Sequence, residues 1–137
     1  MMSILAILVV VVLNLVPSNV TTFNMQMNEN DTIRFTRQSD GGWNAVKLPK
    51  NDLGTFYVDG AKLTMKGEGK KYTQDISTML GVDKDTDWKK LKEVKFGDSP
   101  LQIERKEDGL DLILTEKDGD RETKQTFKVR WDNNELK

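Results

Sequence analysis

Cysteine and histidine are both absent from this 137-residue chain. Without them the chain has no Ser-His-Asp or Cys-His nucleophile, no zinc site of the usual kind and no haem or iron–sulfur ligation by these residues. Glycine-rich phosphate-binding motifs are absent as well. The sequence therefore predicts a protein that is not an enzyme and carries no cofactor. Only a hydrolase that uses carboxylates alone remains as a weaker alternative.

Charge is missing from one end of the chain. Residues 1–28 contain none of its 21 basic and 22 acidic residues, and Ile4–Val16 is apolar apart from Asn14. As a helix this run would span roughly 20 Å, whereas a bilayer core of about 30 Å needs about 20 apolar residues. Pro17 would end the helix. The run therefore has the length of a signal-peptide core, and we expect cleavage after Ser18.

Two alternatives remain open for this segment. It could be retained as an uncleaved membrane anchor, with membrane contact only through residues 4–16, or it could be a buried strand that opens the domain. The predicted organisation is a signal peptide or anchor over residues 1–18, a flexible tether over 19–30 and one β-domain over 31–137. We expect the domain to be secreted or held in the cell envelope.

The rest of the chain is rich in charge but balanced. The net charge is −1, so the sequence lacks the basic footprint of a nucleic-acid-binding protein. The absence of cysteine means that the apolar core and the hydrogen-bonded sheet must stabilise the fold without disulfides.

Apolar residues recur at every second position from Ile33 onward, which is typical of strands with one buried face. Asp-Gly pairs at 59–60, 108–109 and 118–119 separate such runs and predict tight hairpins, the first with a type I′ turn. We predict an all-β domain, possibly with one or two short helices. About eight antiparallel strands would form a meander, as a small β-barrel or a two-layer sandwich.

The short helices are expected in the middle of the chain. Residues 74–80 can form one that ends at Gly81. Residues 86–92 can form another that begins at a cap from Thr86 or Asp87. A strand is equally arguable for residues 91–96.

Gly41-Gly42-Trp43 resembles the G-x-W element that opens the first barrel strand of lipocalins. In that family an arginine late in the barrel packs over the tryptophan, and the resemblance gives this role to Arg130. The chain departs from the pattern because a strand-like segment, Asp31–Arg37, precedes the glycines and no disulfide is possible.

Two further groups are candidate sites. Asp83, Asp85 and Asp87 alternate as in the first half of an EF-hand calcium loop, although Trp88 and Val94 stand where that loop has Gly and Glu. The alternative for this stretch is a solvated acidic loop that caps a short helix.

The second group is aromatic. Trp43 and Trp88 could be core residues or, if exposed, stacking platforms for a ligand. The function most consistent with the sequence is an exported, non-enzymatic binding module for a small ligand, a glycan or a protein partner. The alternative is a membrane-anchored structural or interaction protein of the cell envelope.

Overall fold

The computed structural model describes residues 4–132, so the ends of the predicted segments 1–18 and 31–137 lie outside the described residues. Ten antiparallel strands form one sheet in the order β6-β5-β4-β3-β2-β1-β10-β9-β8-β7. The strands are β1 (Thr22–Gln26), β2 (Thr32–Arg37), β3 (Trp43–Lys47), β4 (Asn51–Asp59), β5 (Lys62–Gly67), β6 (Lys70–Asp75), β7 (Glu93–Phe96), β8 (Ser99–Lys106), β9 (Gly109–Asp118) and β10 (Arg121–Asp132).

The sheet consists of two meanders that are joined along one line. Strands β1 to β6 form the first and β7 to β10 the second, and β1 pairs with β10 through the register Phe23↔Trp131 and Met25↔Val129. The all-β prediction with short helices is therefore confirmed. The sheet has ten strands rather than about eight, and it is open, so the described residues form neither a closed barrel nor a two-layer sandwich.

The flexible tether predicted for residues 19–30 is wrong over its central part. Residues 22–26 form β1, which lies in the middle of the sheet between β2 and β10. Phe23 and Met25 alternate with polar neighbours and have no exposed surface. Two apolar residues at period two are enough to fix a strand when both of its edges find partners.

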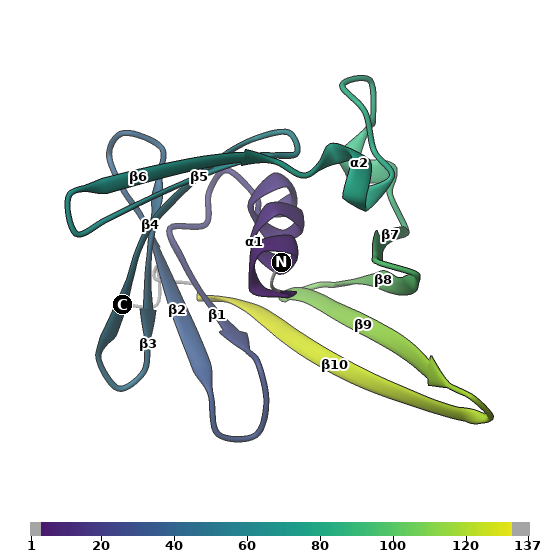
Figure 1. Cartoon of the computed structure of the whole chain (residues 1–137). Helices are drawn as coiled ribbons and strands as arrows, with labels where there is room; N and C mark the ends of the chain where they lie inside the picture. The colour runs from purple at the N-terminus through teal and green to yellow at the C-terminus, as the bar shows by residue number, and fades with distance from the viewer. Residues whose placement is uncertain (1–3, 133–137) are drawn as a thin grey trace.

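The apolar N-terminal segment forms helix α1 (Ile4–Leu15), and this helix lies against the concave side of the curved sheet (Figure 1). The strand alternative for this segment is thus wrong. Four successive valines have a modest intrinsic helix propensity, so packing must stabilise the helix. A helix that is apolar all round has no water-facing side and has to be enclosed, and here the sheet encloses it.

The connection from β6 to β7 runs between the two edges of the sheet. It contains α2 (Ser77–Leu80) and the 3₁₀-helix η1 (Trp88–Lys90). Gly81 ends α2 in the left-handed conformation, and the Asp87 carboxylate accepts a hydrogen bond from the Lys89 N–H at the start of η1. Helical residues lie at both predicted places, but both elements are shorter than predicted, because residues 74–75 belong to β6 and the second element is a 3₁₀-helix of three residues. The strand β7 occupies part of the stretch for which a strand was the alternative.

Not every Asp-Gly pair makes the turn that the sequence suggests. The β4–β5 turn has Gly60 and Ala61 at its centre, and only Gly60 has a positive φ, which is the type II′ pattern. Gly109 is the first residue of β9, and a Cβ there would overlap the Val129 carbonyl oxygen of β10. This glycine is needed for close approach of two strands rather than for a positive φ.

Candidate functional site

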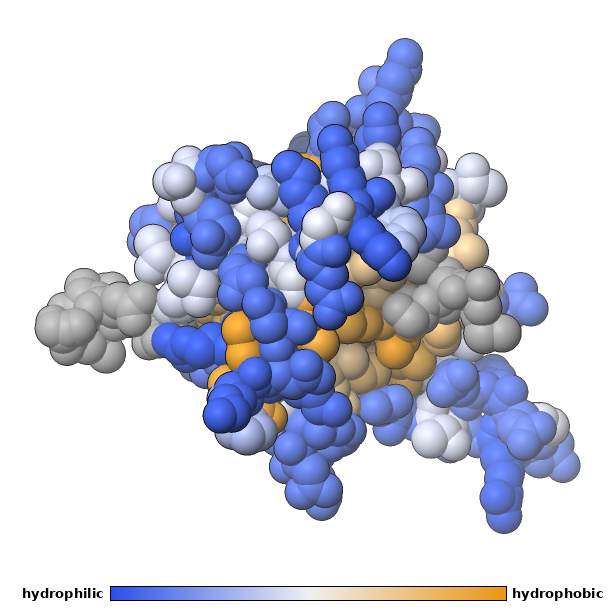
Figure 2. All heavy atoms as spheres, turned by 60° about the vertical axis from the view of Figure 1, so that its left-hand side comes forward, coloured by the Kyte–Doolittle hydropathy of each residue, from blue (hydrophilic) through white to orange (hydrophobic). Residues whose placement is uncertain are grey.

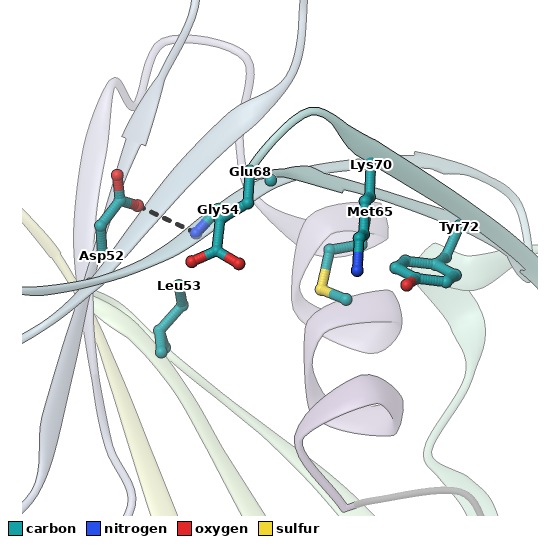
Figure 3. A pocket seen from close by; sticks show the side chains of 8 residues that line it. Asp52, Leu53, Gly54, Met65, Glu68, Lys70 and Tyr72 are labelled. Carbon is teal, nitrogen blue, oxygen red and sulfur yellow. Dashed lines mark hydrogen bonds between the residues drawn. The ribbon is translucent and has the colours of Figure 1, made fainter.

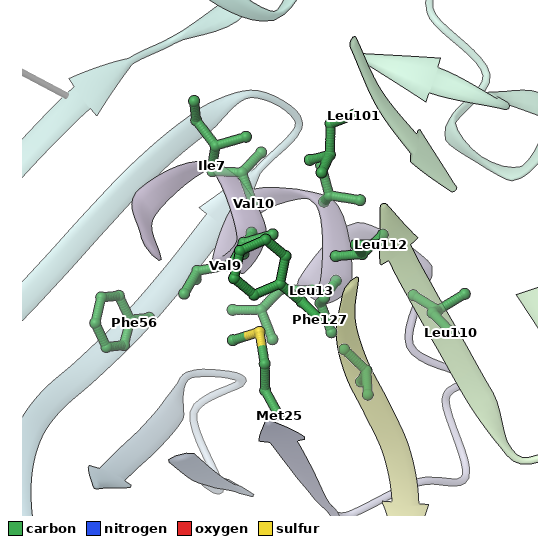
Figure 4. Close-up of a cluster of buried hydrophobic side chains, with 14 of the residues drawn as sticks. Ile7, Val9, Val10, Leu13, Met25, Phe56, Leu101, Leu110, Leu112 and Phe127 are labelled. Carbon is green, nitrogen blue, oxygen red and sulfur yellow. The ribbon is translucent and has the colours of Figure 1, made fainter. Parts of the chain in front are cut away.

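The interior of the curved sheet is the most extensive apolar surface of the molecule. Seven consecutive α1 residues, Ile7 to Leu13, are at most 8% exposed. Figure 4 shows α1 surrounded by side chains from both meanders, among them Phe56 of β4, Met25 of β1 and Leu112 of β9. We call the sheet face that carries these side chains the inner face.

The size of this contact sets its importance for stability. Full burial of one aliphatic side chain is worth about 1.5–3 kcal/mol, so the seven buried residues of α1 amount to roughly 10–20 kcal/mol before entropy costs. Whole domains are stable by about 5–15 kcal/mol. The inner face therefore needs an apolar occupant, and in this structure that occupant is α1.

Asn14 is the polar residue within the apolar segment, and it marks the end of the buried helix. Its side-chain Nδ2 donates to the Val10 carbonyl and to the Gly60 carbonyl in the β4–β5 turn, both at 2.8 Å. The first bond lies within α1, and the second fixes the C-terminal end of α1 to the sheet. Local sequence patterns cannot indicate this role, because it depends on a contact across 46 positions.

Three cations lie together where the chain leaves α1. Arg37, Lys89 and Arg105 line a pocket of about 500 Å³ together with residues 13–18, and no carboxylate is among its lining residues. We call it the rim pocket. Arg37 belongs to β2, Lys89 to η1 and Arg105 to β8, so the fold alone brings the three together.

Hydrogen bonds hold both arginines of the rim pocket in place. Arg37 donates from Nε and Nη2 to the Val20 carbonyl and from Nη2 to the Pro17 carbonyl. Arg105 donates to the Leu91 carbonyl at 2.8 Å and to the Trp88 carbonyl at 3.1 Å. Each guanidinium is therefore positioned by neutral backbone acceptors, which leave its charge uncompensated.

A second pocket, of about 540 Å³, opens over β4, β5 and β6. Met65 and Tyr72 are paired across β5 and β6, and Figure 3 shows them close to Lys70. Asp52 and Glu68 also line this pocket, so its charges are mixed. Figure 2 shows apolar residues visible between projecting hydrophilic side chains on this side of the molecule.

The structure separates the residues that the lipocalin resemblance put together. Trp43 is 3% exposed, and the arginine over its ring is Arg37, at 4.4 Å from the centroid. Arg130 instead donates to the Asp111 carboxylate at 2.8 Å. It alternates with the buried Val129 and therefore lies on the other face of the sheet. The predicted role of Arg130 over Trp43 is wrong.

Trp43 is a core residue rather than an exposed platform. Trp43 packs against Phe23 with ring centroids 5.1 Å apart, and Phe23 also packs against Trp131 at 5.7 Å. Trp88 is half-buried against the same core. The interpretation of Trp43 as a surface stacking platform is therefore wrong, because its strand turns it inward.

The acidic stretch serves local structure. The Asp83 carboxylate accepts hydrogen bonds from the Asp85 N–H and the Thr86 hydroxyl, and that of Asp87 caps η1. Within residues 4–132 the structure contains no group of three or more acidic residues placed to hold a metal ion. The arrangement of Asp83, Asp85 and Asp87 is that of a capped loop, the alternative left open by the sequence.

The resolved pKa shifts belong to exposed groups away from the interior. A hydrogen bond from the Tyr57 hydroxyl at 2.7 Å, followed by one from the Gly42 N–H, lowers the pKa of Asp40. The same contact raises the pKa of Tyr57. The two hydrogen bonds to the Asp40 carboxylate stabilise the turn between β2 and β3.

Comparison of the chain with protein-family models, with curated proteins and with solved structures found no match. No helix in the part of the chain that the structure describes is long and apolar enough to cross a membrane.

The rim pocket was missed in the sequence, although a signal for it was present. Ile33 and Phe35 are followed at period two by Arg37, and Leu101 and Ile103 are followed by Arg105. An arginine that continues an inward-facing series marks the place where an apolar face reaches solvent. Nothing in the sequence indicated that the two series end beside the same helix.

Proposed function

We propose that this protein is an exported, non-enzymatic binding module that holds a small apolar ligand on the inner face of its sheet. The observation that carries the proposal is the enclosure of seven consecutive α1 residues by that face. In the chain as described, α1 fills the position that the ligand takes when the helix is cleaved off or displaced.

The physical argument concerns what happens to the inner face without α1. Aromatic and aliphatic side chains such as Phe56, Met25 and Leu112 would then border a space that water fills at a high free-energy cost. The sheet must either collapse or accept another apolar occupant. Two pockets already reach the surface at the ends of this region, one at the C-terminal end of α1 and one over β4 to β6, and they offer entry.

Among the occupants that the sequence left open, a small apolar ligand fits better than a glycan. The two tryptophans that the sequence offered as stacking platforms for a glycan are buried (Trp43) or half-buried against the core (Trp88). The second candidate function is a membrane-anchored interaction protein of the envelope, which the apolar character of Ile4–Leu15 favours. Fractionation of the source cells separates the two, because an anchored form is recovered only with detergent.

The test weakens α1 in the full chain and measures binding of N-phenyl-1-naphthylamine, an uncharged dye that fluoresces in apolar surroundings. Val10 is fully buried, so Val10→Asp should drive α1 out of the interior. We expect saturable binding of one dye per chain, at least tenfold tighter than in the unmodified protein, because the competing helix is removed. Asn19→Asp makes the same change of charge at an exposed position and should leave binding unchanged.

Circular dichroism decides between displacement and unfolding. The proposal requires that Val10→Asp keep the β-sheet signal. Loss of that signal without saturable dye binding would mean that α1 is a permanent part of the core. Asn14→Ala provides a milder variant, because it removes only the two hydrogen bonds at the end of α1, and it should tighten dye binding several-fold in a chain that remains folded.

A further inference from the structure

We infer that the ligand is an anionic amphiphile, with its apolar tail in the place of α1 and its carboxylate or phosphate group in the rim pocket. This inference rests on the proposed function and adds the chemical class of the ligand. It depends on the position of three cations relative to the inner face, which can be followed strand by strand.

Arg37 and Arg105 stand at inner-face positions at the ends of their strands. In β2 the buried Ile33 and Phe35 precede Arg37 at period two, and β8 ends in the same way after Leu101 and Ile103. Alternation along a strand puts such residues on one face. The two guanidinium groups therefore form the rim of the apolar surface that α1 covers.

The chain segment that directly follows α1 already accepts hydrogen bonds from this charge. The helix C-terminus carries a partial negative charge on its free carbonyl groups, and α1 ends at Leu15 beside the rim pocket. Arg37 donates to the Pro17 carbonyl at 3.2 Å and to the Val20 carbonyl at 2.8 Å. An apolar rod with a negative end is thus what the interior holds, and an anionic amphiphile has the same distribution of polarity and charge.

Charge complementarity favours an anion over a neutral or cationic head group. The rim pocket has three cations and no acidic residue among its lining residues, whereas the pocket over β4 to β6 combines Lys70 with Asp52 and Glu68. Lys89 is exposed, and although its backbone N–H donates to Asp87, its side-chain ammonium group has no hydrogen-bond or ion-pair partner among the described residues. Its ammonium group is free to meet a carboxylate or phosphate.

The experiment compares dodecanoate, dodecyl phosphate and 1-dodecanol as competitors of N-phenyl-1-naphthylamine in the full chain and in its Asn14→Ala variant. The three share one tail and differ in head group. At low salt and pH 7.5 we expect both anions to compete at least tenfold more strongly than the alcohol. The advantage should shrink at 1 M salt, because exposed charges are screened there.

Lys89→Gln and Lys90→Gln form the matched pair of variants. Both lysines are exposed residues of η1, but only Lys89 lines the rim pocket. We expect Lys89→Gln to weaken competition by the two anions about three- to tenfold, to leave 1-dodecanol unchanged and to keep the fold. Lys90→Gln should behave like the unmodified protein.

The outcomes separate the inference from the proposed function. If the three amphiphiles compete equally and Lys89→Gln changes none of them, the inference of an anionic head group is wrong, whereas the proposed apolar site is still supported. Failure of all three to compete, together with failure of the dye to bind, would overturn the proposed function itself. If inorganic phosphate or acetate displaces dodecanoate and dodecyl phosphate at equal concentration, the inference of an amphiphilic ligand is wrong, because the rim pocket would then bind free anions that have no tail.

Discussion

The two faces of the same ten-stranded sheet differ sharply. The inner face is a continuous apolar surface that reaches from β4 across β1 and β10 to β8, and it encloses α1. The outer face carries isolated polar contacts such as Arg130 with Asp111 and Tyr57 with Asp40. The difference shows that apolar packing is concentrated on one face of the sheet and charged contacts on the other, which is why we propose the inner face as the binding site.

The largest contrast between the faces should come from Leu112, which is fully buried in β9. Leu112→Ala should lower the free energy of unfolding by about 2–5 kcal/mol, because it removes apolar contacts and leaves a cavity. Urea unfolding measures the change. Lys128→Ala, at an exposed position of the paired strand β10, should alter stability by less than about 0.5 kcal/mol. Equal small effects would mean that Leu112 does not face a packed core.

The pairing of β9 with β10 gives a second, steric test. Gly109→Ala places a methyl group against the Val129 carbonyl oxygen, and we expect a loss of about 1–3 kcal/mol in urea unfolding. Gly67→Ala is the control, because its nearest neighbour lies 3.7 Å from the added Cβ. If the two substitutions cost the same, β9 and β10 do not approach as closely as described.

The outer face is not uniformly tolerant. The Asp111 side chain is 14% exposed and binds the Arg130 guanidinium at 2.8 Å. Asp111→Ala should therefore cost about 1–2 kcal/mol, in the lower part of the range for a lost charged hydrogen bond, because Arg130 remains 36% exposed. Lys106→Ala removes a partner that lies 3.9 Å away and should cost less. An Asp111 effect no larger than that of Lys106 would reduce this contact to an ordinary surface pair.

The smallest expected effect is a pH dependence at the β2–β3 turn. The pKa of Asp40 is lowered in the folded protein, mainly by the Tyr57 hydroxyl. The ionised carboxylate therefore contributes stability above its ordinary pKa of 3.8, and this contribution is lost as the pH falls through the lowered value. NMR titration of Tyr57→Phe should show the Asp40 pKa returning toward its ordinary value. The Asp75 pKa, lowered by Ser77, should stay unchanged as the internal control.

Much of this fold could be predicted from the sequence. Period-two runs between tight turns indicated the antiparallel sheet, and Pro17 indicated the end of an N-terminal helix. These features depend on neighbours within a few residues, so local pattern is sufficient to predict them. The strand β1 was missed because only Phe23 and Met25 mark it, and because one of its two partners, β10, lies at the opposite end of the domain's sequence.

The candidate site was the less predictable part. The sequence predicted a candidate calcium site at Asp83–Asp87 because its acidic residues lie close together in the chain. In the structure these carboxylates accept hydrogen bonds from neighbouring backbone N–H groups instead. Arg37 and Arg105 are far apart in sequence and meet only through the curvature of the sheet. The packing of α1 against the sheet was equally hard to predict. The same apolar pattern is found in membrane helices, in signal peptides and in helices buried in a protein interior.

Hydrogen exchange of the full chain, with and without dodecanoate, tests most directly whether α1 is a displaceable occupant. We predict that the amides of residues 8–13 exchange through an opening of lower free energy than the amides at the centre of β1 and β10. We also predict that dodecanoate removes the protection of the α1 amides and leaves the protection of the sheet amides unchanged. Exchange of α1 and the central strands together, at the rate of global unfolding and without response to dodecanoate, would contradict both predictions and make α1 a fixed part of the core.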